Sequence, residues 1–413
     1  MQPPPERPGW LDRLIAHGPA VGGAEYLVSL DAQELIDTAI ASTGGLDDFG
    51  DDFDDVDWRK WYELLVCSLD TESSLHLAGR LMARHDVLRC LRNRLLLADL
   101  WKRRPEILAS ELLPPSFVIG MARSGTSILS ELLALDETAR TPKMWEMLHP
   151  VESTQDDRLR PAGHAQTVMM EDLAPEYATM HENSGDLPNE CIFIMANTFL
   201  SDQWSGCHEV PSYAKETVLA DYRPVYEHHR NVLKTLQQRG AERCNRWGLK
   251  APSHLQLLEE LFTVYPEAYA IRIHRDPLKS MPSTVSLMHT LKRMRCESWS
   301  EDNAKRIATG NAYMFQQEIE KRADGRVPDE RFIDVRYHDL MADPSGTVGT
   351  IYERAGWDYP QALADRIDDY IRNRPRGKHG QHSYSLEALG FDRDEERERF
   401  RFYCERYDVP EED

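Results

Sequence analysis

The chain has 413 residues, and its 49 Lys and Arg against 70 Asp and Glu give a formal net charge of −21. This acidic balance argues against nucleic acid as the main partner, because phosphate contacts need clustered Lys and Arg. The seven cysteines are scattered without a close Cys-x-x-Cys pair, so we expect neither a disulfide framework nor a metal site.

No stretch of the sequence predicts a secretion signal or a membrane span. The N-terminal residues, MQPPPERPGWLDRL, lack the apolar core of a signal peptide. The longest apolar runs fall short of the roughly 20 residues that a membrane helix needs. We therefore expect a cytoplasmic protein, and the sequence leaves its oligomeric state open, a homo-oligomer included.

Residues 1–113 are predicted to form a mainly helical N-terminal region. Apolar residues recur at helical spacing within 31–43, and 72–102 is a long amphipathic stretch. Between them lies the acidic segment 44–57, GGLDDFGDDFDDVD. It lacks the alternating ligands and closing Glu of a calcium loop, so we expect a solvated linker.

The stretch 114–127, PPSFVIGMARSGTS, is the most informative part of the chain. Its apolar run 117–119 predicts a buried parallel strand, and the periodic apolar residues that follow the stretch predict a helix. A strand that runs through a glycine-bounded loop into a helix N-terminus can hold an anion, because the loop N–H groups and the helix dipole both face it. The segment therefore predicts a phosphate-binding loop.

The spacing of Gly120 and Gly125 is that of a Walker A loop, but Walker A requires Lys-Ser/Thr after the second glycine. Here Thr126-Ser127 follow instead, and the cation stands earlier, at Arg123. An ordinary ATP-binding loop is therefore disfavoured. A purely structural strand–helix corner is the alternative interpretation.

This variant resembles the 5′-phosphosulfate loop of sulfotransferases that use 3′-phosphoadenosine 5′-phosphosulfate (PAPS), in which a basic residue precedes Ser/Thr-Gly-Thr-Ser/Thr. The arginine in place of lysine is most similar to the bacterial branch of that family. The resemblance implies that the 5′-phosphosulfate is held by Arg123, Ser124, Gly125, Thr126 and Ser127.

A second stretch, 268–283, reads AYAIRIHRDPLKSMPS and predicts a strand that ends at Arg275-Asp-Pro. Ser283 follows Arg275 by eight positions, which resembles the family's site for the nucleotide 3′-phosphate. The arginine guanidinium can donate two parallel hydrogen bonds to a phosphate dianion, and a serine hydroxyl near a helix start adds an uncharged hydrogen-bond donor. Arg272 and Lys279 add basic charge to this predicted nucleotide site. A capped turn with a surface Arg–Asp pair is the alternative.

A third stretch, 246–254, reads RWGLKAPSH. The resemblance implies that Lys250 stabilises the charge on the leaving oxygen and that His254 removes the proton of the acceptor hydroxyl. Glu146 lies 23 residues after Arg123 and resembles the catalytic glutamate of tyrosylprotein and some bacterial sulfotransferases. Both His254 and Glu146 stay open as the base, with His254 slightly ahead.

The C-terminal part extends the resemblance, which covers residues 114–390. Residues 331–336 predict a strand that leads into Tyr337, the counterpart of a nucleotide-contacting tyrosine. The basic loop 374–380 resembles a late loop that closes over the 3′-phosphate, although it departs from the usual Arg-Lys-Gly order; a solvated basic turn is the alternative. Its basic residues are Arg374, Arg376 and Lys378.

Alternating strands and helices predict an α/β fold, a P-loop-like parallel sheet flanked by helices, in a domain over 114–390. The helical insertion 150–245 is rich in Met and aromatic residues and is expected to form an acceptor pocket or lid, with an ordinary helical subdomain core as the alternative. Its His228-His229 pair is expected to be polar surface. Residues 391–413 are expected to be a C-terminal helical tail.

The predicted activity is transfer of a sulfuryl group from PAPS, without a metal, to a small and hydrophobic acceptor. The acceptor group is expected to be a hydroxyl, with an amine as second choice. A P-loop kinase or NTPase is one rival, which the missing lysine after Gly125 disfavours. A non-catalytic nucleotide-binding scaffold is the other, and it would have no use for a base and an oxyanion partner.

Overall fold

The computed structural model describes residues 6–412 except 181–183, 299, 301–302 and 374–385. Its centre is a five-stranded parallel sheet with the order β2-β3-β1-β4-β5. The strands are β1 Pro115–Ile119, β2 Ala139–Arg140, β3 Arg246–Lys250, β4 Tyr269–His274 and β5 Phe332–Arg336. The predicted α/β fold is thus confirmed.

The central strand β1 is buried along its whole length, which explains its unbroken apolar sequence. In the sheet, Phe117 lies between Leu249 of β3 and Ala270 of β4. The edge strand β2 was not predicted, because a strand of two residues carries no periodic signal.

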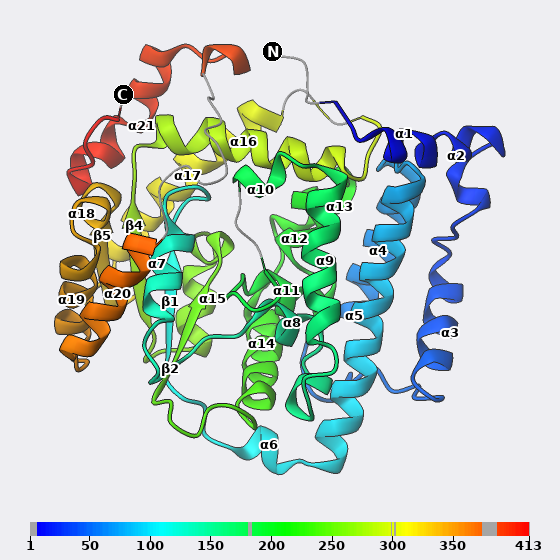
Figure 1. The fold of residues 1–413 in the computed structure, drawn as a ribbon, viewed down its shortest axis with the longest axis horizontal. Coiled ribbons are helices and arrows are strands. Elements are labelled where there is room, and N and C mark those ends of the chain that lie inside the picture. The colour runs from blue at the N-terminus through cyan, green and yellow to red at the C-terminus, as the bar shows by residue number, and fades with distance from the viewer. Residues whose placement is uncertain (1–5, 181–183, 299, 301–302, 374–385, 413) are drawn as a thin grey trace.

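Helices cover both faces of the sheet and continue away from it (Figure 1). Those within and after the sheet are α7 Thr126–Leu133, α15 Leu258–Val264, α16 Pro277–Arg293, α17 Asn303–Ala323, α18 Tyr337–Ala342, α19 Pro344–Ala355, α20 Gln361–Asn373 and α21 Arg393–Tyr407. Helix α16 begins at Pro277, because this proline occupies its first turn and the Asp276 carboxylate accepts a hydrogen bond from the Leu278 N–H (3.0 Å).

The segment 150–245 contains several helices and lies between the sheet and the N-terminal helices (Figure 1). Helix α8 Met144–Leu148 precedes this segment. The α-helices within it are α9 Arg160–Leu173, α10 Tyr177–Met180, α11 Ile192–Met195, α12 Asp202–Cys207, α13 Pro211–Thr217 and α14 Arg223–Leu236. The N-terminal helices are α1 Gly9–Ile15, α2 His17–Ala20, α3 Ala32–Ser42, α4 Trp58–Thr71, α5 Leu77–Arg103 and α6 Glu106–Ala109.

One hydrophobic cluster joins these three regions. It contains Leu65 and Trp101 from the N-terminal helices, Phe117 and Leu249 from the sheet, and Trp204 from the insertion. All five side chains are almost fully buried. No helix among the described residues is both long and apolar enough to cross a membrane.

Two expectations about polar residues are wrong. His228 and His229 are buried, because their Nδ1 atoms find partners in the Asp54 carboxylate (2.7 Å) and the Tyr265 hydroxyl (2.8 Å). Asp54 belongs to the acidic segment 44–57, so this segment contributes a buried carboxylate and is not solvated throughout.

Candidate active site

The loop after β1 is held against the start of α16. The Arg123 Nε donates to the Ser283 Oγ (3.0 Å), and the Thr284 hydroxyl donates to the Ala122 carbonyl (3.0 Å). Arg123 itself has a positive φ of 67°, an uncommon conformation for a residue with a side chain. The structure therefore brings together the arginine of the predicted 5′-phosphosulfate loop and the serine of the predicted 3′-phosphate site.

Gly125 allows this loop to pass close to Tyr337. Its φ is 100°, and a Cβ added there would lie 2.6 Å from the Tyr337 ring. Helix α7 starts at the next residue, so the N–H groups of Thr126 and Ser127 belong to a first turn that has no intrahelical acceptors. In contrast, the Ser124 hydroxyl donates to the Met121 carbonyl (2.7 Å) and stabilises the turn.

Arg275 lies next to this loop at the end of β4. Its guanidinium stacks over the Tyr337 ring at 4.0 Å, and its Nη1 donates to the Arg123 carbonyl (3.0 Å). Its Nε and Nη2 donate to the Glu412 carboxylate at 2.8–3.2 Å. The predicted nucleotide residues Arg123, Arg275, Ser283 and Tyr337 thus form one cluster.

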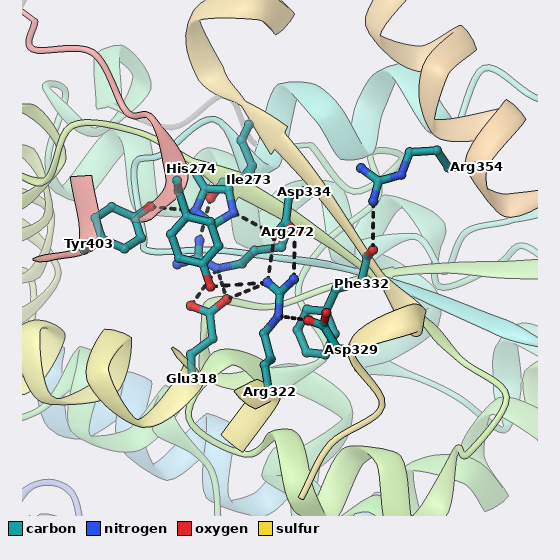
Figure 2. A network of polar contacts seen from close by, with 11 residues as sticks. Arg272, Ile273, His274, Glu318, Arg322, Asp329, Phe332, Asp334, Arg354 and Tyr403 are labelled. Carbon is teal, nitrogen blue, oxygen red and sulfur yellow. Dashed lines mark hydrogen bonds and ion pairs between the residues drawn. The ribbon is translucent and has the colours of Figure 1, made fainter. Parts of the chain in front are cut away.

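Arg272 does not belong to that cluster. It is completely buried, and its Nε donates to both oxygens of Glu318 (2.9 and 3.0 Å). Figure 2 shows this pair in a network that links β4, α17 and β5 through His274, Arg322 and Asp334. The expectation that Arg272 serves the nucleotide site is therefore wrong, since Glu318 already neutralises it in the core.

Lys250 lies at the end of β3 and is 2% exposed. Its Nζ donates to the Glu190 carboxylate (3.0 Å) and reaches the Ser127 hydroxyl at 3.4 Å. The Cys191 N–H donates to the Lys250 carbonyl (2.9 Å), which fixes the chain at Glu190 beside the strand end. Lys250 is thus placed between the loop after β1 and a carboxylate.

His254 has a different environment. It is fully buried; its Nδ1 forms a hydrogen bond of 2.7 Å with the Tyr226 hydroxyl, and its ring packs edge-on against Phe117. Burial lowers the pKa of His254 to about 3, so the ring is neutral at pH 7. The structure does not bring this residue to the cavity described below.

Glu146 is also bound within the protein. Its carboxylate accepts two hydrogen bonds from the Arg140 guanidinium (2.6 and 3.0 Å) and one from the Lys143 N–H (2.8 Å). Among the described residues that line the cavity, neither Glu146 nor His254 is found. Arg374, Arg376 and Lys378 lie outside the described residues.

A cavity of about 440 Å³ opens at this edge of the sheet. Part of its wall is formed by the loop after β1 and its neighbours, with Arg123, Gly125, Thr126, Ser127, Arg275 and Tyr337. Apolar residues of the insertion and of α16 form another part, among them Met170, Met180, Ile192, Phe193, Leu287 and Met288. Within the part of the chain that the structure describes, no group of three or more His, Cys, Asp or Glu side chains could hold a metal ion.

Glu190 and Asp202 are among the carboxylates in the cavity wall that the sequence analysis missed. Glu190 lines the cavity, and its contact with Lys250 spans 60 residues of sequence. Asp202 also lines the cavity; burial raises its pKa to about 6, and a hydrogen bond from Gln256 (2.7 Å) opposes that rise. Both stand in irregular or short helical segments, where no periodic pattern marks them.

Comparisons with known proteins agree with this geometry. A model of the sulfotransferase family matches residues 114–361. The curated omega-hydroxy-beta-dihydromenaquinone-9 sulfotransferase Stf3 of Mycobacterium bovis is 26% identical over 286 residues, which are 66% of this chain and 71% of that protein.

Two solved structures are similar over most of the chain. Sulfotransferase STF1 from Mycobacterium tuberculosis has a TM-score of 0.75 and 29% identity, covering 89% of this chain and 97% of its own. Sulfotransferase STF9 from Mycobacterium avium has a TM-score of 0.79 and 25% identity, covering 92% and 97%. The chain belongs to the sulfotransferase family and is a sulfotransferase enzyme.

Proposed function

We propose that the protein transfers the sulfuryl group of PAPS to the hydroxyl group of a hydrophobic small molecule. The observation that carries the proposal is the cavity, whose wall combines the loop after β1 with apolar residues of the insertion and of α16. The Lys250–Glu190 pair connects the two, because Lys250 also reaches Ser127 of the loop.

The polar part of the wall suits the charges of the donor. Thr126 and Ser127 offer first-turn N–H groups and hydroxyls to a 5′-phosphosulfate, and Arg123 stands beside them. Arg275 and Ser283 suit the 3′-phosphate, because the arginine can bind it with two parallel hydrogen bonds and the serine hydroxyl adds an uncharged donor. These cations can meet the nucleotide charge, so the proposal includes no metal.

We assign the chemical roles from the positions of the side chains. PAPS, when bound, supplies the sulfuryl group and leaves as adenosine 3′,5′-bisphosphate. A bond forms between the acceptor oxygen and sulfur while the bond from sulfur to the 5′-phosphate oxygen breaks, and Lys250 stabilises the charge on that leaving oxygen. The Glu190 carboxylate takes the acceptor proton, in place of His254 and Glu146, because it lies in the cavity wall next to Lys250.

The apolar part of the wall favours a hydrophobic alcohol as the acceptor. Helices α9, α10 and α11 supply its Met, Ile and Phe side chains, so the insertion 150–245 acts as the acceptor pocket. The related Stf3 carries the name of an omega-hydroxylated menaquinone derivative, which also combines a hydroxyl with an apolar body. We propose hydroxylated isoprenoid or polyketide-like molecules as the first acceptors to screen.

Calorimetric titration with adenosine 3′,5′-bisphosphate, and with ATP and magnesium in parallel, tests the donor. We expect binding of the bisphosphate that does not depend on magnesium and exceeds the binding of ATP. A preference for ATP with magnesium would overturn the proposal and move the protein to phosphoryl transfer.

The change Arg275→Ala tests the 3′-phosphate site. We expect it to weaken the binding of adenosine 3′,5′-bisphosphate by roughly 10- to 100-fold, because charge-assisted hydrogen bonds are lost. Binding of adenosine 5′-phosphosulfate, which has no 3′-phosphate, should change by about twofold or less. Equal losses for both ligands would remove Arg275 from this role.

A further inference from the structure

The edge of Arg275 that suits a phosphate is already occupied. Its Nε lies 2.9 Å from one oxygen of Glu412, and its Nε and Nη2 lie 3.2 and 2.8 Å from the other. Burial alone would lower the pKa of Arg275, but the hydrogen bonds that it donates to Glu412, together with the nearby Tyr337 and the charges of Glu412 and Asp276, raise the pKa overall. A carboxylate with this two-pronged geometry is the closest protein equivalent of a phosphate on arginine.

Glu412 is held at this position by its own backbone. Its N–H donates to the Asp276 carboxylate (2.9 Å), the residue next to Arg275. The Arg397 guanidinium of α21 donates to both oxygens of the same aspartate (3.0 and 3.1 Å). The contact with Arg275 is therefore one part of a built arrangement around the turn between β4 and α16.

Helix α21 is anchored to the same strand. The Tyr403 hydroxyl lies 3.0 Å from the His274 Nδ1, as Figure 2 shows, and the Tyr407 ring stacks on the His274 ring at 4.0 Å. Asp408 then takes a left-handed conformation with φ 52° and turns the chain after the helix. The sequence 408–412 is thereby directed to Arg275.

A 3′-phosphate on Arg275 and the Glu412 carboxylate exclude each other. Both need the same Nε–Nη2 edge, and the Nη1 of Arg275 is bound to the Arg123 carbonyl. Even a neighbouring position would place two anions close together, and their repulsion is stronger in a partly buried site than in water. Arg275 and Glu412 are both partly exposed, at 22% and 27% of their side chains, so the pair can open without unfolding the core.

We propose that Glu412 is an internal competitor of the nucleotide 3′-phosphate and closes this part of the site until a 3′-phosphorylated nucleotide displaces it. The inference rests on the proposed function, because it takes Arg275 as the 3′-phosphate residue. Glu412 thus sets a threshold for donor binding and, after transfer, helps to expel the bisphosphate product.

The test compares Glu412→Gln with the unchanged protein by calorimetry. The amide removes the charge that holds Arg275, so the fraction of molecules with a free Arg275 rises and the apparent affinity for adenosine 3′,5′-bisphosphate increases, by roughly tenfold. The affinity for adenosine 5′-phosphosulfate should change by about twofold or less, because that ligand does not compete for Arg275.

The neighbouring acid provides the matched control. Glu411 has the same charge and 76% exposure, and it contacts Arg397 at 3.7 Å instead of Arg275. Glu411→Gln should leave both affinities within about twofold of the unchanged protein. An equal gain in both variants would mean a general charge effect and would overturn the proposal.

The remaining outcomes separate the inference from the proposed function. Weaker binding of the bisphosphate to Glu412→Gln would mean that Glu412 positions Arg275, which overturns the competition. Unchanged binding would overturn it as well, while the proposed function stands. If neither protein prefers the bisphosphate over adenosine 5′-phosphosulfate, the 3′-phosphate site itself fails, and the inference fails with it.

Discussion

At the scale of single residues, Lys250 and His254 lie close together in sequence near the end of β3. Their surroundings differ, and this difference suits them to different tasks. Lys250 has two polar partners that both line the cavity, Ser127 and Glu190. His254 follows Lys250 by only four residues, yet it is enclosed by Phe117 and Tyr226. A histidine whose pKa burial lowers to about 3, and which does not line the cavity, is better suited to packing than to proton transfer.

The change Glu190→Gln tests this assignment. Gln keeps the shape and an oxygen for Lys250, but it cannot take a proton, so we expect kcat to fall by roughly 10²- to 10⁴-fold. Binding of adenosine 3′,5′-bisphosphate should stay within about twofold. Single-turnover kinetics with PAPS labelled in its sulfuryl group measures the loss of transfer rate. Calorimetry measures the binding of adenosine 3′,5′-bisphosphate. Activity within a few-fold of the unchanged protein would exclude Glu190 as the base.

The matching change His254→Ala should act on stability instead. It leaves the Tyr226 hydroxyl without its hydrogen bond and a small void beside Phe117. We expect the free energy of unfolding to fall by about 1–3 kcal/mol, with kcat of the folded enzyme changed by less than about tenfold. Urea unfolding together with initial rates checks both values. A large loss of kcat at unchanged stability would restore His254 as the base.

At the scale of elements, the loop after β1 depends on two neighbours, the start of α16 and the start of α18. Ser283 and Thr284 of α16 hold the loop by hydrogen bonds to Arg123 and Ala122. Tyr337, the first residue of α18, packs under Arg275 and next to Gly125. The conformation of this loop therefore depends on the packing of three elements.

We expect Gly125→Ala to disrupt that packing. The new Cβ would collide with the Tyr337 ring, and φ 100° is strained for alanine by about 1–2 kcal/mol. Gly325→Ala is the control, since Gly325 also has a positive φ, 77°, but has nothing within 4 Å. Both changes should lower Tm, whereas only Gly125→Ala should weaken nucleotide binding, by at least roughly tenfold. If Gly125→Ala and Gly325→Ala bind the nucleotide with equal affinity, the loop tolerates the displacement of Tyr337.

At the scale of the whole molecule, buried histidines connect stability to pH. Burial lowers the pKa of eight histidines among the described residues, and for five of these it falls to about 3 (His208 and His254) or to about 4 (His76, His149 and His274). In the unfolded chain a histidine has a pKa of about 6.5. Below that pH the unfolded state binds protons that the native state does not, so stability falls as the pH falls.

We therefore expect Tm to decrease steadily from pH 7.5 to pH 5.5. Each of the five histidines contributes a loss of about 1 kcal/mol at pH 5.5. The net charge of −21 acts in the opposite direction, because acidification relieves repulsion among the surface carboxylates. Screening weakens that repulsion, so the histidines should dominate at 0.15 M salt. Scanning fluorimetry at constant ionic strength measures the result, and a flat or rising Tm would contradict it.

The sequence by itself determined the fold class, the family and most of the residues that cluster around the loop after β1. These depend on local patterns: apolar runs of strand length, glycines at fixed spacing around Arg123, and the Arg-Asp-Pro turn at Arg275, each of which acts within a few residues of chain. Because parallel strands end at one edge of a sheet, such local signals also predict which loops meet there.

Only the tertiary structure decided the burial of His254, the pairing of Lys250 with Glu190 and the contact between Arg275 and Glu412. The last two pairs join residues that lie 60 and 137 positions apart in the chain, in segments without periodicity. The role of an ionisable group is set by its desolvation and its nearest charge, and neither quantity is local in sequence.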